Sequence, residues 1–181
     1  MAEADLYPHI KRWLDAEFPL VREGRWWLSD RRALVTANLN WIDAGTWMRP
    51  DLAMVHVHRR RFDTSAVLDL YTFEVKPTGR AALEGLHQAL AHGRFADFSL
   101  YVVPAQDELR SEVSAQADRF GIGVVAYKHP LRFSDFEILV PPRRGDPDPD
   151  LRDLFLDRAL DADGSAAEVM QWVGAPTRRR S

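Results

Sequence analysis

Two carboxylates and a lysine form the pattern in this sequence that could do chemistry. Asp51 follows Pro50, and the tripeptide Glu74-Val75-Lys76 comes later in a second apolar stretch. Two converging carboxylates suit Mg²⁺, which also takes water and a phosphate oxygen of its substrate. A metal ion in such a site lowers the pKa of bound water and offsets the charge that builds on phosphorus. The pattern therefore predicts phosphodiester hydrolysis.

Lysine is rare in this chain. Lysine and arginine total 24, and since the three lysines are Lys11, Lys76 and Lys128, the remaining 21 are arginines. Lys76 alone lies inside an apolar strand, two residues after a carboxylate. Arginine would replace it poorly because arginine stays protonated and carries a larger planar fork. We expect Lys76 to orient the nucleophilic water or to contact the phosphate.

The alternation of side chains predicts how these residues are held. Residues 51–58 and 66–76 have the composition of two strands of a hairpin. Because side chains alternate along a strand, Glu74 and Lys76 share one face while their neighbours point to the other. Asp51 opens the neighbouring strand, so its carboxylate meets Glu74 if the pairing register is favourable. A charge buried in an apolar strand is costly unless it pairs with an opposite charge or binds a metal.

Helices alternate with strands in the rest of the chain. Amphipathic spacing predicts a helix over 3–18, and since Pro8 fits only the first turn, the regular helix is expected to begin near Asp5. Strand composition over 20–49 is broken by Ser29-Asp30 and by Gly45. Further helices are predicted over 81–95 and 107–120, and further strands over 98–104, 122–127 and 136–140. This order favours an α/β fold with a mixed central sheet flanked by helices.

The end of the chain has a different composition. Residues 141–150 are rich in proline and charge, which is typical of a linker. We therefore expect one domain over 1–140, and then a short helical extension and a frayed tail over 151–181. The extension is predicted to hold two short helices, broken near Asp163-Gly164.

The motif and the element order together resemble the PD-(D/E)xK nuclease superfamily, the restriction-endonuclease-like proteins. The resemblance covers roughly residues 3–127 and implies a metal-dependent deoxyribonuclease that uses Mg²⁺, with Mn²⁺ as a substitute. It implies Asp51 and Glu74 as metal ligands and Lys76 as the catalytic lysine. In this superfamily, cutting of both DNA strands often involves a homodimer.

The resemblance also points to two auxiliary residues. The opening Glu-x-x-Leu-Tyr-Pro is similar to uncharacterised bacterial members, in which a glutamate of the first helix joins the metal site; this carries over to Glu3. RecB-like members have Gln-x-x-x-Tyr on the helix after the motif. Gln88 matches the glutamine, whereas His92 stands where the tyrosine would be. Glu84, Gln88 and His92 share one helical stripe that could face the site.

Structural interpretations stand beside these functional ones. Glu74 and Lys76 could form a solvated cross-strand pair, Asp51 could simply begin a strand, and Glu3 could be a helix-start charge favoured by the dipole. A non-catalytic nucleic-acid-binding or assembly module on a nuclease-like fold is the alternative function. Titration with Mn²⁺ would distinguish it, because a binding-only module should show no metal affinity that depends on Asp51.

The segment from His56 to Arg61 offers further alternatives. His56 and His58 share a strand face and could ligate zinc in a hydrolase, although no third ligand has a recognisable spacing. The run Arg59-Arg60-Arg61 would repel a cation there. The run itself is either a solvated hairpin tip or a phosphate-contacting patch beside the active site.

Composition excludes several classes of protein. The chain has 181 residues, 46% hydrophobic content and six tryptophans, which fit one globular domain and argue against disorder. A net charge of −3 excludes a basic, histone-like binder, and the lack of cysteine excludes disulfides and thiolate chemistry. No apolar run approaches the ~20 residues of a membrane span, and the N-terminus is not a signal peptide. Cytoplasm is the expected compartment.

Overall fold

The centre of the molecule is a six-stranded sheet with the strand order β1-β2-β3-β4-β5-β6. The strands are β1 (Trp26–Val35), β2 (Leu52–Arg60), β3 (Val67–Val75), β4 (Phe98–Pro104), β5 (Gly123–Tyr127) and β6 (Phe136–Val140). Strands β1, β2 and β3 pair antiparallel, β3, β4 and β5 pair parallel, and β6 returns antiparallel to β5. The predicted mixed α/β sheet is confirmed.

This computed structural model describes residues 2–21, 26–41, 49–60, 62–63, 65–77, 82–105 and 110–174. Several sequence predictions fall outside these ranges. They are the break at Gly45, the arginine at position 61, the first turn of the helix predicted from 107, and the tail after Gly174.

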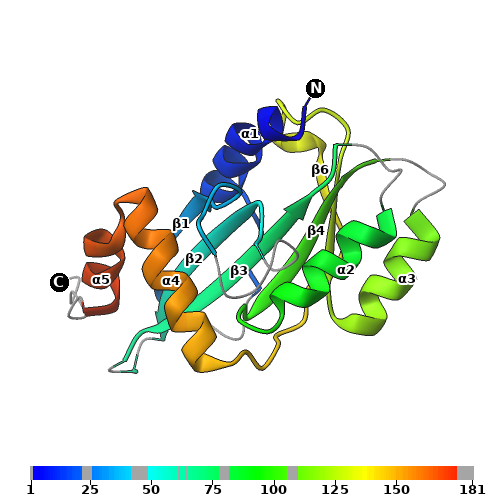
Figure 1. Cartoon of the computed structure of the whole chain (residues 1–181). Helices are drawn as coiled ribbons and strands as arrows, with labels where there is room; N and C mark the ends of the chain where they lie inside the picture. Colours follow the sequence, from blue (N-terminus) through cyan, green and yellow to red (C-terminus); the bar gives the residue numbers. More distant parts are fainter. Residues whose placement is uncertain are drawn as a thin grey trace.

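Helices cover both faces of the sheet (Figure 1). They are α1 (Glu3–Ala16), α2 (Ala82–His92), α3 (Arg110–Phe120), α4 (Pro149–Asp163) and α5 (Ala166–Gly174). Helix α1 packs its apolar stripe against one face, on Met54 and Phe73 among others. The other helices pack on the opposite face, where α2 and α3 contact Tyr101 and Val124, and α4 and α5 contact Val55. Alternate residues of each central strand therefore enter different cores.

The register of the predicted β2–β3 hairpin brings its two motif ends together. Leu52 pairs with Phe73, and the backbone N–H of Asp51 donates to the carbonyl of Phe73 at 3.1 Å. The amino end of β2 thus lies beside the carboxyl end of β3. In Figure 1 the amino end of α1 lies at this same end of the strands.

Two local predictions were wrong. Strand β1 runs unbroken through Ser29 and Asp30, because Ser29 pairs with His58 and Asp30 with Val57 in the ladder with β2. Helix α1 begins at Glu3 rather than near Asp5, which places Pro8 in its second turn. Proline there forfeits a single hydrogen bond near the helix start, and the buried stripe of α1 outweighs that loss.

Helices α4 and α5 match the two helices predicted after residue 150. The Asp148 side chain caps α4 by accepting from the backbone N–H groups of Asp150 and Leu151. The helix ends at Gly164, which adopts a left-handed φ of 71°. Buried residues of α4 belong to the same apolar cluster as Val55 and Val57 of β2. In the described part of the chain, no helix combines the length and apolar character of a membrane span.

Candidate active site

Glu74 and Lys76 lie together at the carboxyl end of β3. The Lys76 Nζ atom donates to Glu74 Oε1 at 2.6 Å, and the side chains are 3% and 16% exposed, respectively. The alternation along β3 turns Glu74 away from α1 and toward the side that α2 covers, as Phe73 and Val75 belong to the core beneath α1. The pair is therefore a largely buried lysine–carboxyl hydrogen bond on a central strand and not a solvated pair on an edge strand.

Asp51 meets this pair from the neighbouring strand. Its Oδ2 atom accepts from the backbone N–H of Val75 at 2.7 Å, between the two motif residues of β3. Its Oδ1 atom accepts from the Tyr7 hydroxyl at 2.7 Å. Only 9% of the surface of Asp51 is exposed. Because each of its carboxylate oxygens accepts a hydrogen bond, the side chain is held in one orientation, unlike that of a residue that merely begins a strand.

Helix α1 supplies Glu3 and Tyr7 to the same cluster. The Tyr7 hydroxyl lies 2.8 Å from Glu3 Oε1 as well as near Asp51, so one phenol bridges the two carboxylates. Lys76 Nζ lies 3.8 Å from Glu3 Oε2. The helix and the sheet thus bring Glu3, Asp51, Glu74 and Lys76 into one cluster. Tyr7 was missed in the sequence because its helical spacing marks it equally as a core residue.

The electrostatics of the cluster favour an added cation. Burial and then the charge of Asp51 raise the pKa of Glu74 to about 8. Burial also raises the pKa of Asp51, although the hydrogen bonds that it accepts from Val75 and Tyr7 act to lower it. Burial lowers the pKa of Lys76, but the hydrogen bond and charge of Glu74 outweigh burial and raise it overall. Burial thus disfavours negative charge on both carboxyl groups, and a bound cation would relieve that cost.

Gln88 lies on α2, above this side of the sheet. Its Oε1 atom is buried and finds no hydrogen-bond donor among the described residues. No contact joining Gln88 to Glu74 or Lys76 is found there either. His92, one turn further on, is fully buried and has its Nε2 atom 3.9 Å from Glu74 Oε2. Burial lowers the pKa of His92 to about 3, so the imidazole is neutral.

Tyr101 on β4 is a further neighbour that the sequence did not reveal. It pairs with Glu74 in the parallel ladder, and its buried hydroxyl has no partner in the described ranges. Gly85 of α2 makes room for its ring, because a Cβ atom there would lie 2.4 Å from a Tyr101 ring carbon. His92 and Tyr101 are therefore the polar neighbours of Glu74 on the side of the sheet that α2 covers.

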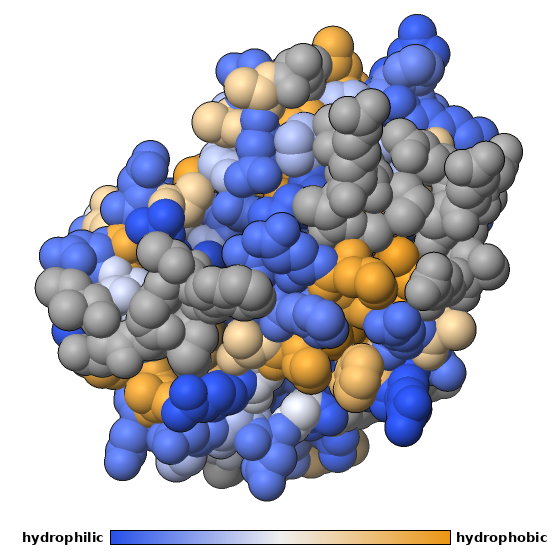
Figure 2. Space-filling model, turned by 45° about the vertical axis from the view of Figure 1, so that its right-hand side comes forward, coloured by the Kyte–Doolittle hydropathy of each residue, from blue (hydrophilic) through white to orange (hydrophobic). Residues whose placement is uncertain are grey.

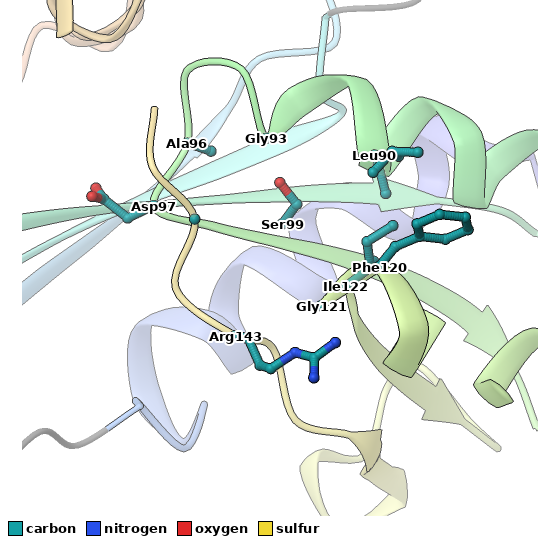
Figure 3. A pocket seen from close by; sticks show the side chains of 11 residues that line it. Leu90, Gly93, Ala96, Asp97, Ser99, Phe120, Gly121, Ile122 and Arg143 are labelled. Carbon is teal, nitrogen blue, oxygen red and sulfur yellow. The ribbon is translucent and has the colours of Figure 1, made fainter. Parts of the chain in front are cut away.

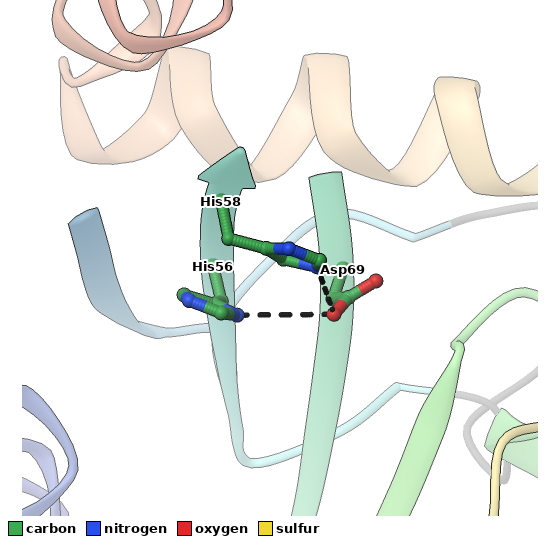
Figure 4. A group of neighbouring side chains, drawn as sticks. All are labelled: His56, His58 and Asp69. Atoms are coloured by element: carbon green, nitrogen blue, oxygen red, sulfur yellow. Dashed lines mark hydrogen bonds and ion pairs between the residues drawn. The ribbon is translucent and has the colours of Figure 1, made fainter. Parts of the chain in front are cut away.

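A second polar cluster lies on the α1 side of the sheet. His56 and His58 stack with their ring centroids 4.8 Å apart, and both turn toward Asp69 of β3 (Figure 4). His58 Nε2 lies 3.0 Å and His56 Nδ1 3.8 Å from Asp69 Oδ2. The register pairs His56 with Asp69, so the strand pairing supplies the third ligand type that sequence spacing did not reveal.

Arginines already compensate the charge of this cluster. Arg144 donates to Asp69 Oδ1 at 2.9 Å and to Asp97 at 3.3 Å, and Arg152 donates to Asp97 at 3.0 Å. Burial raises the pKa of Asp69, but the hydrogen bonds and the charge of Arg144 outweigh it and lower the pKa overall. The two arginines pair with the two aspartates, while the ligand atoms of His56, His58 and Asp69 lie within 4.8 Å of one another, close enough to share a metal ion. The cluster ties the chain after β6 to the sheet.

Arg59 and Arg60 do not lie beside the carboxylate site. Arg59 is buried and donates to the carbonyl of Val173 in α5, and Arg60 ends β2. Asp51 precedes the opposite end of the same nine-residue strand, which spans roughly 27–30 Å at the usual rise per residue. The interpretation as a phosphate-contacting patch beside the site is therefore wrong for Arg59 and Arg60.

Other surface features lie on the α2–α3 side. Figure 2 shows apolar side chains gathered on the face turned toward the viewer; the exposed large apolar residues of these two helices are Leu83, Leu90 and Phe120. A small cavity of about 60 Å³ lies nearby, with Leu90, Ser99 and Arg143 among its lining residues (Figure 3). It includes none of the residues of the carboxylate cluster.

No protein-family model matches this chain, and no curated protein matches it. Among solved structures, it is similar to a protein of unknown function from Silicibacter pomeroyi, with 13% sequence identity and a TM-score of 0.49. The similarity covers 97% of this chain and 93% of that chain. Because the function of that protein is unknown, the comparison assigns no activity here.

Proposed function

We propose that this chain is a metal-dependent nuclease of the PD-(D/E)xK superfamily, hydrolysing phosphodiester bonds in DNA. The observation that carries the proposal is the convergence of Asp51, Glu74 and Lys76 at the adjoining ends of two paired strands, where the backbone of Val75 links them. A cross-strand pair kept only for stability would not require a second buried carboxylate beside it, because like charges in a buried site are destabilising.

The donor set fits Mg²⁺ or Mn²⁺. Asp51 and Glu74 would hold the ion through carboxylate oxygens, and Glu3 could add a third carboxylate from α1. When bound, the ion would lower the pKa of water and offset charge on the phosphate. Lys76 would position the attacking water or contact a phosphate oxygen from its place beside Glu74. Gln88, whose buried Oε1 atom finds no donor among the described residues, is an auxiliary residue in this proposal.

The order of elements supports the same assignment. A helix, a hairpin carrying the motif, a helix, a parallel strand, a helix and another parallel strand follow one another along the chain, as the resemblance implies. The long antiparallel part of the sheet holds Asp51 in register with β3. The restriction-endonuclease-like assignment of this mixed sheet is part of the proposal.

The test is cleavage of labelled DNA by the purified full chain with Mg²⁺ or Mn²⁺. Lys76→Ala is expected to lower the rate by at least ~100-fold, as for the loss of one charge-stabilising group in an active site. Lys128→Ala is the matched control, because Lys128 is an exposed lysine just past β5. Circular dichroism would check that both variants fold.

Two results would count against the nuclease proposal. Cleavage by Lys76→Ala at the wild-type rate would remove the mechanism. DNA binding without cutting, together with no Mn²⁺ affinity in a calorimetric titration, would favour the non-catalytic binding module instead.

A further inference from the structure

A hollow of about 500 Å³ lies against the carboxylate cluster. Its polar lining residues include Glu3, Asp51 and Asn38, while Pro8, Val35 and Ala37 supply an apolar wall and Arg49 adds a cation. Val35, a large apolar residue, ends strand β1 and is 46% exposed. Cavities of about 300–1,000 Å³ with apolar walls and few polar groups are typical of sites for small ligands or ligand fragments.

Hydrogen bonds fix the wall of this hollow relative to Asp51. The backbone N–H groups of Thr36 and Ala37 donate to the carbonyl of Asp51 at 2.9 and 3.0 Å. The Thr36 hydroxyl donates to the carbonyl of Pro50 at 2.7 Å. Opposite this wall, the Tyr7 hydroxyl links α1 to Asp51. Both sides of the hollow are therefore anchored at the residue that would bind the metal.

The chemistry of the hollow matches one nucleotide. A divalent ion on Asp51 would attract a phosphate, Arg49 could contact a second phosphate oxygen, and the apolar wall could take the face of a sugar or base. We propose that this hollow seats one unpaired nucleotide next to the scissile phosphate, so that the preferred substrate is single-stranded DNA or a frayed DNA end. This inference rests on the proposed nuclease function.

Burial of the carboxylates favours an unpaired nucleotide over a base-paired one. Glu74 is 3% exposed and Asp51 9% exposed, so a reacting phosphate must enter the molecule's surface to reach them. A nucleotide in a duplex is held by pairing and stacking, and flipping it out costs a few kcal/mol. An unpaired nucleotide enters without that cost.

The test compares three labelled substrates of one sequence: a 12-nucleotide single strand, a blunt duplex and a duplex with a single-stranded overhang. With Mg²⁺, the wild-type chain is expected to cut the single strand and the overhang at least tenfold faster than the blunt duplex. Val35→Trp, which fills the hollow, should raise KM for the single strand at least tenfold. Val67→Trp is the control, because Val67 is 43% exposed at the far end of β3.

A Mn²⁺ titration of Val35→Trp separates blocking of the hollow from damage to the site. Unchanged Mn²⁺ affinity with raised KM supports the inference. If Val35→Trp misfolds, Arg49→Glu provides the second test, since it reverses a charge on an exposed wall residue and should also raise KM. Faster cutting of the blunt duplex, or unchanged KM in folded variants, overturns the inference while leaving the nuclease proposal intact. Absence of all cutting by the wild type overturns both.

Discussion

The Oδ2 atom of Asp51 accepts a 2.7 Å hydrogen bond from the backbone N–H of Val75, the residue between Glu74 and Lys76. A side chain thus takes the place of a backbone carbonyl as the acceptor at the end of the β2–β3 ladder. The same bond that completes the sheet sets the distance between the two candidate metal ligands. Substitutions at Asp51 can separate its role in the sheet from its role in the site.

Asp51→Asn is expected to fold and to lose metal binding. The amide oxygen can still accept from Val75, while the charge that would hold the ion is gone. Mn²⁺ affinity measured by calorimetry should fall by about 10–100-fold or more, and the metal-free melting temperature should stay the same or rise, since one of two repelling buried carboxylates is removed. Asp51→Ala should instead destabilise the fold by about 1–3 kcal/mol, because the Val75 N–H loses its acceptor. Equal Mn²⁺ affinity in wild type and Asp51→Asn would contradict the assignment.

Tyr7→Phe tests the bridge between helix and sheet. The ring remains to fill the core, but the hydroxyl that joins Glu3 and Asp51 is lost. We expect Mn²⁺ affinity to fall by about tenfold, as when a group that orients a metal ligand is removed. Stability should fall by only about 1 kcal/mol. Tyr127→Phe is the control, since Tyr127 is buried on β5, two strands from Glu74. A similar loss of affinity in both variants would mean that Tyr7 has no orienting role.

The metal-free protein should become less stable as the pH rises from about 4.5 to about 8. Glu74 keeps its proton in the folded state up to about pH 8, whereas the unfolded chain releases it near the ordinary value of 4.5. Unfolding in this range releases a proton, so the free energy of unfolding falls with rising pH. The charged and titratable groups around Glu74 are Asp51, Lys76, His92, Glu3 and Tyr101. Thermal melting with a chelator present, at pH 5 to 8, measures the effect.

Glu74→Gln is the control for that titration. Glutamine does not titrate, so the melting temperature of this variant should vary less with pH over the same interval. Added Mg²⁺ should stabilise the wild type most at the alkaline end, where Glu74 binds an ion without first losing a proton. If the melting temperatures of the wild type and of Glu74→Gln changed with pH in parallel, Glu74 would not be the source of the pH dependence.

Asp69→Asn tests the histidine cluster as a structural feature. The change leaves Arg144 facing a neutral amide in a buried network, so we expect a loss of about 2–4 kcal/mol in the free energy of unfolding. Mn²⁺ affinity at the carboxylate site should be unchanged. Elemental analysis of the purified wild type should find no stoichiometric zinc. If the wild type carried one equivalent of zinc and Asp69→Asn carried none, the histidine cluster would be a metal site and not only a structural feature.

Much of the candidate site could be predicted from the sequence because it follows from short-range rules. Alternation along β3 puts Glu74 and Lys76 on one face, and the hairpin pattern makes the strand of Asp51 their neighbour. Helical spacing likewise marks the buried face of α1. The helix was expected to begin near Asp5 because of Pro8, but it begins two residues earlier, at Glu3.

The remaining features depend on pairing between distant segments. Asp69 meets His56 and Arg144 only through the strand register and the path of the chain after β6. Tyr101 reaches Glu74 through the parallel pairing of β3 with β4. Ser29 lies inside β1 because β2 pairs along its whole length, so the local turn tendency of Ser29-Asp30 is overridden by the ladder.

The candidate ligands are held by two kinds of attachment. Asp51 and Glu74 belong to hydrogen-bonded strands, whose spacing hardly varies, while Glu3 rests on a helix seated largely by apolar side chains such as Leu6 and Ile10. Repacking those side chains would shift the helix by fractions of an ångström without breaking the ladder. The cluster is thus divided into a fixed half and an adjustable half, so the size of ion that the proposed metal site would accept could be retuned from α1 alone.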